Sequence, residues 1–328
     1  MLGYIVRRLL LMIPTLGFIS LISFVVIQLP PGNFLTSYVA GLAQQGITVD
    51  QAAIETLRER YGLGQPLIEQ YWKWISGILL HGDFGQSFGW NVPVSSLLWG
   101  RVGMTFALAI ATLFFVWAIA FPIGIYSAVK RYSIGDYVVT VIGFIGLAIP
   151  NFLLALLLMY FSFRWFGESV GGLFSPAYVN APWSMARVLD FLSHLWIAVV
   201  VLGASGATAL IRIMRANLLD ELRKPYVVTA RAKGVSELRL LFKYPVRLAL
   251  NPFISTVGWI LPELVSGSAV VSIVLGLPTT GPLLLTALTT QDMYLAGGML
   301  LVISALTVIG TLISDILLAL LDPRISYE

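Results

Sequence analysis

The sequence predicts an all-α integral membrane protein with six transmembrane helices, and three observations support that fold class. Of its 328 residues, 58% are hydrophobic and only 11% are charged, whereas a soluble domain carries about 25% charged residues. So few charged side chains cannot cover a water-facing surface around one large core. Long apolar stretches recur along the chain, and the basic residues gather in alternate connections between them. We therefore expect lipid to replace water around most of the protein.

Six stretches are long enough to cross a bilayer as helices, which requires about 20 mostly apolar residues. They are too long and too uniformly apolar for barrel strands, which alternate over about ten residues. The six stretches are residues 9–29, 102–129, 137–163, 191–211, 250–274 and 295–321. Pro122, Pro150 and Pro262 lie inside spans, where neighbouring helices can satisfy the freed carbonyl groups. The first stretch is too long for the apolar core of a signal peptide, so we expect it to be retained.

The distribution of basic residues predicts the orientation of these helices. Most of the 20 Lys and Arg residues lie in the N-terminal segment, the connections after the second and fourth spans, and the C-terminal segment. Short cytoplasmic connections are enriched in Lys and Arg. Both termini are therefore predicted to be cytoplasmic, and residues 1–328 are predicted to form a single transmembrane domain.

The first outer connection, residues 31–100, is predicted to be a small folded insert on the extracytoplasmic side. Thr48-Val-Asp-Gln51 has the form of a capping box for a helix that continues through Arg60. A second helix is expected from Pro66. One face of that helix would consist of Leu67, Tyr71, Ile75 and Leu79. Trp72 and Trp74 suit the headgroup level of a bilayer, but packing against the protein's own outer surface fits the sequence equally well.

The connection after the fourth span, residues 212–249, carries the densest cluster of basic side chains in the chain. Pro225 can begin a short helix, and Gly234 can end it after about two turns. Ser236 can cap a further helix. We therefore expect helix, turn and helix on the cytoplasmic face. A basic loop that rests on anionic lipid headgroups would also fit this composition.

The run Tyr226-Val-Val-Thr-Ala-Arg-Ala-Lys-Gly234 resembles the coupling loop, or EAA motif, of permease subunits from ATP-binding-cassette (ABC) importers. More narrowly, it resembles the dipeptide/oligopeptide/nickel branch. The resemblance extends along nearly the whole chain, through Tyr4-Ile-Val-Arg-Arg, Gly82-Asp-Phe-Gly-Gln-Ser-Phe88, Ala148-Ile-Pro-Asn and Leu321-Asp-Pro-Arg-Ile325. The long first outer loop and the C-terminal run are similar to those of the B-type subunit, which pairs with a C-type partner.

This resemblance implies the architecture of a type I ABC importer permease and a role for the basic connection. In the family, the short helix before the motif's glycine seats in a groove of a cytoplasmic ATPase subunit. The residues that the resemblance assigns to ATPase coupling are Tyr226, Thr229, Ala230, Arg231, Ala232, Lys233 and Gly234. The two alanines would allow close approach, and the two basic side chains would pair with carboxylates of the ATPase. Val228 stands where the motif has its nominal glutamate.

The resemblance also implies the partners and the location. We expect a heterodimer with a C-type permease subunit, two cytoplasmic ATPase subunits, an extracytoplasmic solute-binding protein and membrane lipid, but no nucleic acid. The expected location is the plasma (inner) membrane of a bacterium or archaeon, which the chain crosses several times. The chain itself is expected to be a transport subunit and not an enzyme, with ATP and Mg²⁺ bound by its partners. It has no Cys, two His and no phosphate-binding glycine loop, so we expect no cofactor or metal on this chain.

The alternative is a secondary transporter or channel that works without ATPase subunits. Such proteins commonly contain internal repeats with interrupted helices in matching positions. The two halves of this sequence show no clear repeat, which favours the importer.

Polar residues of the fifth span are candidates for a translocation path. Glu263 lies near its middle, and Ser266, Ser268 and Ser272 recur along the same span. A charge at bilayer depth costs at least about 2.5 kcal/mol, so such residues usually face a cavity or a partner. These four residues either line a path or serve as hydrogen-bonding and packing residues between helices.

The resemblance implies a peptide-like or oligosaccharide-like solute, with opines and nickel as other cargoes of the family. Ser272 stands where many members of the family have Glu. Loss of an acidic group would suit a neutral or differently charged solute, which leaves the cargo open.

Two expectations concern contacts between the spans. Asp315, near the cytoplasmic end of the sixth span, is expected to pair with a basic residue. The small residues of segment 203–209 are expected to form a face on which another helix packs closely.

Overall fold

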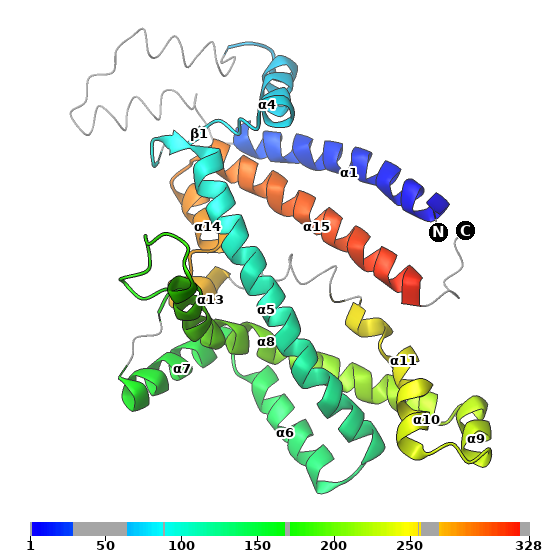
Figure 1. Ribbon diagram of the computed structural model, residues 1–328. Coiled ribbons are helices and arrows are strands. Elements are labelled where there is room, and N and C mark those ends of the chain that lie inside the picture. Colours follow the sequence, from blue (N-terminus) through cyan, green and yellow to red (C-terminus); the bar gives the residue numbers. More distant parts are fainter. Residues whose placement is uncertain are drawn as a thin grey trace. The chain divides into compact units, whose positions relative to one another are not determined.

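The computed structural model describes residues 2–28, 64–87, 89–167, 171–254, 256 and 269–321 (Figure 1). The helices in these ranges are α1 (Leu2–Gln28), α4 (Leu67–His81), α5 (Val94–Val129), α6 (Ile134–Ala148), α7 (Asn151–Phe166), α8 (Met185–Leu222), α9 (Pro225–Ala232), α10 (Glu237–Lys243), α11 (Pro245–Ala249), α13 (Ala269–Val274), α14 (Thr280–Thr289) and α15 (Met293–Leu321). Strands β1 (Gln86–Ser87) and β2 (Val92–Pro93) form an antiparallel hairpin in which Ser87 pairs with Val92.

The chain forms two compact units. The first contains residues 1–9, 104–282 and 306–328, and the second contains residues 10–103 and 283–305. Helices α1, α5, α14 and α15 contribute residues to both units.

Four described helices are long and apolar enough to cross a membrane, and they match four of the predicted spans. They are α1 from Val6 to Gln28, α5, α8, and α15 from Met293 to Leu317. Pro122 lies inside α5, as expected. The predicted span 250–274 is described only at 250–254, at 256 and in α13, so Pro262 lies outside the described residues.

The prediction of one continuous helix over residues 137–163 was wrong. The chain instead forms α6 and α7, which are bent by 103° at a short break. Pro150 lies at the break, where it has no N–H to donate and disfavours helical conformation at the preceding residue. Ile149 is accordingly extended, with φ −82° and ψ 122°. The two helices together provide at most a fifth span among the described residues.

Small residues allow helices to approach closely in the first unit. A methyl group added at Gly203 of α8 would lie 2.7 Å from Cδ1 of Phe115 in α5, and one added at Gly143 of α6 would lie 2.8 Å from Cγ2 of Thr208 in α8. The predicted packing face 203–209 is therefore confirmed. Buried apolar residues from α5, α7, α8 and α13 form a cluster that includes Leu108, Ala155, Val201 and Val271.

An ion pair joins the beginning of α1 to the end of α15, and both of its members belong to the first unit. Nη1 of Arg8 lies 3.2 Å from Oδ2 of Asp315. The expected pairing of Asp315 with a basic residue is therefore confirmed.

In the second unit, α4 packs against α1. The rings of Tyr71 and Trp74 have their centroids 5.5 and 6.0 Å from that of Phe24 in α1. The hydroxyl groups of Tyr71 and Ser20 are hydrogen-bonded at 2.7 Å. Trp72, in contrast, is 63% exposed. Trp74 therefore packs against the protein's own surface, whereas the Trp72 side chain is exposed to solvent or lipid.

The predicted apolar face of α4 was partly wrong. Ile75 is buried, but Leu67 and Leu79 are exposed, and Trp74 occupies the buried side instead. The helix turns this side inward because Tyr71 and Trp74 both meet Phe24. The capping-box segment 48–51 lies outside the described residues.

A buried carboxylate holds the β hairpin in the second unit. Oδ2 of Asp292 accepts hydrogen bonds from the Ser87 hydroxyl at 2.5 Å and from the Gly89 N–H at 3.1 Å. Oδ1 of Asp292 accepts one from the Leu295 N–H at 3.3 Å, at the beginning of α15. Asp292 therefore has a structural role that the sequence did not reveal.

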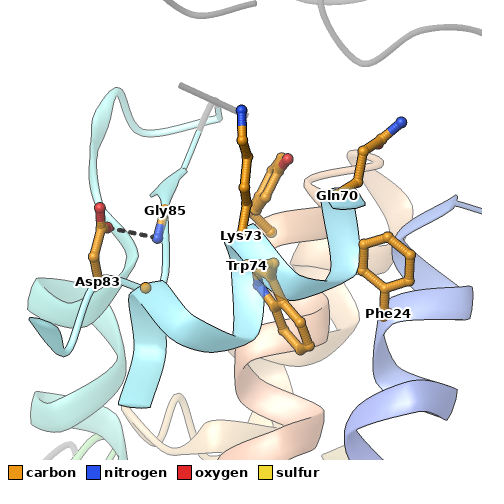
Figure 2. Close-up of a pocket in the computed structure, with 8 residues that line it drawn as sticks. Phe24, Gln70, Lys73, Trp74, Asp83 and Gly85 are labelled. Carbon is orange, nitrogen blue, oxygen red and sulfur yellow. Dashed lines mark hydrogen bonds between the residues drawn. The ribbon is translucent and has the colours of Figure 1, made fainter. Parts of the chain in front are cut away.

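The second unit also contains a small pocket of about 50 Å³ beside α4 (Figure 2). Trp74 lines the pocket, and its indole Nε1 is buried and makes no hydrogen bond within the described part of the chain. Asp83, on the pocket wall, accepts a hydrogen bond from the Gly85 N–H at 2.9 Å. In Figure 2 the Lys73 side chain points away from the indole. The pocket is large enough for a water molecule.

The close contact at Gly203 makes a prediction about stability. Substitution Gly203→Ala should overpack the contact with Phe115 and lower the free energy of unfolding by about 1–3 kcal/mol. Gly206→Ala is the matched control, because its added methyl group would lie 3.7 Å from Cγ2 of Val116, an ordinary contact. Thermal unfolding of the two variants in detergent should show a lower midpoint for Gly203→Ala alone. Equal midpoints would contradict the packing described here.

Candidate coupling site

Helix α9 begins as a separate helix because Pro225 disfavours continuation of α8. The residue before a proline is driven out of helical conformation, and Lys224 is extended, with φ −69° and ψ 146°. Pro225 then occupies the first position of α9, where no helical hydrogen bond requires its missing N–H. The Tyr226 hydroxyl donates a hydrogen bond to Glu221 across this corner. The predicted short helix is thus present.

Gly234 ends α9 through a left-handed turn. Its φ of +76° lies in a region that glycine adopts readily and other residues do not. The Gly234 N–H donates to the carbonyl of Arg231 at 3.0 Å, and the Val235 N–H donates to that of Ala230 at 3.3 Å. Ser236 precedes α10 at the predicted cap position, although its side chain makes no capping hydrogen bond. The predicted order of helix, turn and helix is confirmed.

Helix α9 has an inner and an outer face. Val227 and Ala230 are buried against Leu240 of α10, as their spacing of three residues on a helix allows. Val228 and Ala232, four residues apart, are exposed on the outer face. Ala230, which was expected to approach an ATPase, therefore packs against this chain's own α10.

Helices α10 and α11 connect α9 to α8. Leu240 of α10 packs against α9, whereas the next residue, Leu241, belongs to an apolar cluster with Leu218 of α8. Val246 and Ala249 of α11 join the same cluster. The short helix is therefore held to the end of α8 by two successive layers of buried apolar side chains.

The outer surface of α9 and α10 combines apolar and basic side chains. Val228, Leu238 and Phe242 are 55%, 73% and 52% exposed. Exposed basic residues lie beside them in the sequence: Arg231, Lys233, Arg239 and Lys243. An exposed apolar group of this kind outside the apolar spans indicates a protein-binding surface, and the surrounding positive charge suits an acidic partner. We call Val228, Ala232, Leu238 and Phe242 the outer patch.

Arg231 has a partner within the segment. Its Nε and Nη2 donate to Oε1 and Oε2 of Glu237 at 2.6 and 3.1 Å. The hydrogen bond from Arg231 holds the pKa of the Glu237 carboxyl below its ordinary value, and the same contact raises the pKa of Arg231. Lys233 forms no ion pair with any residue in the described ranges. Lys233 is therefore better placed than Arg231 to meet a carboxylate of another protein.

Of the four predicted path residues, only Ser272 lies within the described residues. Glu263, Ser266 and Ser268 lie outside the described residues. Ser272 in α13 is fully buried, and its hydroxyl makes no hydrogen bond within the described part of the chain. Its neighbour Val271 belongs to the cluster shared by α7 and α8. A role for Ser272 on a path stays a prediction.

Two protein-family profiles together match nearly the whole chain. Residues 120–327 match the family described as the binding-protein-dependent transport system inner membrane component, and residues 1–109 match the N-terminal membrane component of such systems. The chain belongs to this family.

Relatives of the permease are similar to it along their full length. It is 36% identical to the oligopeptide transport system permease protein AppB of Bacillus subtilis over 331 residues, and 32% identical to the glutathione transport system permease protein GsiC of Shigella boydii over 330 residues. It is 28% identical to the dipeptide transport system permease protein DppB of Escherichia coli over 344 residues. Each comparison covers 100% of both chains. The permease is thus a multi-pass inner-membrane transport subunit of the dipeptide/oligopeptide branch, and not itself an enzyme.

A buried ion pair of the permease was not predicted. Arg215 of α8 donates to Asp136 of α6 through Nε at 3.0 Å and Nη2 at 2.8 Å. Asp136 is only 2% exposed and also accepts a hydrogen bond from the Tyr132 N–H at 2.9 Å. The pair joins α6 to the same end of α8 that supports α10 and α11. Its sequence signal was weak, because Asp136 precedes the predicted third span and Arg215 is one of many basic residues in its connection.

The two layers beneath α9 make a prediction about local stability. Substitution Leu240→Ala should remove about 2–5 kcal/mol of packing energy and speed amide hydrogen exchange across residues 225–235. Leu238→Ala is the matched control, because Leu238 is 73% exposed and supports no buried layer. Its exchange should equal that of the wild-type permease. Equal protection of α9 in both variants would show that Leu240 does not hold it.

Proposed function

We propose that the permease forms, with a paralogous C-type permease subunit, the pathway of an ATP-driven importer, and that the outer patch docks on a cytoplasmic ATPase subunit. The observation that carries this proposal is the exposed apolar surface of α9 and α10 beside an excess of positive charge. Docking would cover Val228, Leu238 and Phe242. The remaining coupling residues Tyr226, Thr229, Arg231, Lys233 and Gly234 lie on the same short segment. Family membership in binding-protein-dependent transport supports this proposal over a secondary transporter or channel.

The packing beneath α9 suggests how ATPase movement reaches the membrane. A displacement of α9 would push on Leu240, and through Leu241 on the apolar cluster that holds Leu218 of α8. Close-packed interiors transmit displacement because they have low compressibility. Helix α8 continues without a break to Met185. Closure of two ATPase subunits on bound ATP and Mg²⁺ would thus move a membrane-spanning helix.

The proposed topology has six spans with both termini in the cytoplasm. The concentration of basic residues in 212–249 supports a cytoplasmic coupling loop under the positive-inside rule. The insert 31–100 would then face the opposite side, where a solute-binding protein delivers cargo. The pathway residues proposed from the sequence are Glu263, Ser266, Ser268 and Ser272, supported by the rarity of polar groups at bilayer depth.

The relatives named for oligopeptides, dipeptides and glutathione support a peptide-like cargo. We favour this class over oligosaccharides, opines and nickel. The solute-binding protein that works with the permease should therefore bind short peptides when titrated calorimetrically. Tight binding of an oligosaccharide or of Ni²⁺ alone would contradict the cargo class and leave the ATPase docking unaffected.

The docking surface is tested by substitution Ala232→Trp. A large side chain on the outer face of α9 should weaken ATPase docking by about 2 kcal/mol or more, the size of an interface hot spot. Uptake and solute-stimulated ATP hydrolysis should both be lost, while the amount of permease in the membrane is unchanged. Gly234→Leu should have the same effect, because a side chain disfavours φ +76°.

Ala186→Trp is the matched control, since Ala186 is exposed at the opposite end of α8. This variant should still co-purify with two ATPase subunits. Solute-stimulated hydrolysis that persists in an assembled Ala232→Trp importer would overturn the assignment of the outer patch.

A further inference from the structure

A groove lies between α6 and α8 in the first unit, and the proposed coupling function does not use it. Its volume is about 680 Å³, within the range of about 300–1,000 Å³ that small-molecule sites occupy. The lining residues that matter here are Tyr132, Asp136, Thr140, Phe144, Arg212 and Arg215. The groove therefore has a polar end and an apolar wall.

The polar end of the groove contains two guanidinium groups, those of Arg212 and Arg215, and one carboxylate, that of Asp136. Both oxygens of Asp136 are engaged by Arg215. Arg212, one helical turn away, is exposed and forms no ion pair with any residue in the described ranges. Its guanidinium carbon lies 5.8 Å from the ring centroid of Phe144. Arg212 thus offers an anion a charged site directly beside an apolar wall.

The rest of the groove suits a hydrocarbon chain. Val139, Gly143, Phe144 and Ile211 line it. The outward faces of α6 are apolar as well, since Val138, Ile142 and Ile145 are 49%, 63% and 54% exposed. A ligand that entered from the bilayer would therefore meet apolar side chains of α6 before it reached Arg212, which forms no ion pair within the described ranges.

We propose that this groove binds one anionic phospholipid of the cytoplasmic leaflet, with its phosphate on Arg212 and an acyl chain between α6 and α8. The proposal rests on the proposed orientation, which places Arg212 at the cytoplasmic surface. Basic pockets between transmembrane helices on that side are suited to anionic headgroups. The lipid would brace α6 against α8 beside the Asp136–Arg215 pair, close to the helices that support α9.

Charge complementarity favours lipid over a helix of another subunit. A helix seated in the groove would have to carry a carboxylate in register with Arg212, because burial of an unpaired charge costs several kcal/mol. A phospholipid supplies both the anion and the apolar chain that the groove matches.

The test measures lipid retained by the purified importer, assembled with its permease and ATPase partners. Native mass spectrometry after equilibration with phosphatidylglycerol and phosphatidylcholine should show selective retention of phosphatidylglycerol. Arg212→Gln should weaken that retention about fivefold, the contribution of one basic residue to anionic-lipid binding. Arg247→Gln is the charge-matched control, because Arg247 is exposed on α11 and does not line the groove.

A second pair of variants tests whether filling the groove, without a change of charge, removes the lipid. Thr140→Trp should fill the groove and abolish selective retention, whereas Val141→Trp should not, because Val141 is exposed but does not line the groove. Retention that is unchanged in Arg212→Gln and Thr140→Trp, or equal for the two lipids in the wild type, would overturn the proposal.

The absence of cysteine in the chain allows a direct control. Thr140→Cys labelled with a photoactivatable maleimide should cross-link to lipid in the assembled importer. Cross-linking to the partner permease subunit instead would show that protein covers the groove and would overturn the proposal. These results would leave the ATPase docking test unaffected, because docking is measured by hydrolysis in variants of α9.

Discussion

The coupling segment depends on the packing of the last turns of α8 against α5, α10 and α11. Met214 and Leu218 are fully buried and share one cluster with residues of α5, α10 and α11. Leu218 alone, like any fully buried leucine, contributes about 1.5–3 kcal/mol through removal of its side chain from water. Without this layer, α10 and α11 would have no apolar surface to rest on, and α9 would be attached only by its backbone. The layer also places the apolar outer patch on a stiff support, which an interface that transmits movement requires.

The membrane imposes a second constraint, because every backbone N–H and C=O in lipid must be hydrogen-bonded within the protein. The long helices α1, α5, α8 and α15 meet this requirement with hydrogen bonds inside each helix. Pro122 is accommodated inside α5, yet Pro150 separates two helices that meet at 103°. The same residue type therefore has two outcomes, and the sequence around each proline does not distinguish them.

Ion pairs between helices are placed where they connect elements. The buried Asp136 with Arg215 joins α6 to α8, and the more exposed pair of Arg8 with Asp315 joins α1 to α15. Breaking a buried pair by removing one partner is costly, because the other charge is then left unpaired. Asp292 has a comparable role in the second unit, where it accepts hydrogen bonds from the β hairpin and from α15. Arg212 differs from these residues because it lies at a groove and has no carboxylate partner in the described ranges.

The sequence by itself determined the membrane class, four of the spans, the short helix 225–233 and its glycine turn, because these follow from local composition and from the backbone limits of proline and glycine. It also indicated the family, because the order and spacing of its motifs can be recognised from the residues alone, without information on contacts. Only the tertiary structure decided that Ala230 faces inward while Ala232 faces outward, that Trp74 is buried while Trp72 is not, and that Asp136 pairs with Arg215. These outcomes depend on which surface each helix turns toward its neighbours. In α4, apolar side chains lie on more than one face of the helix, since Leu67 and Leu79 are exposed while Trp74 and Ile75 are buried. The sequence pattern of such a helix does not specify the buried face, so contacts between residues far apart in the chain must decide it.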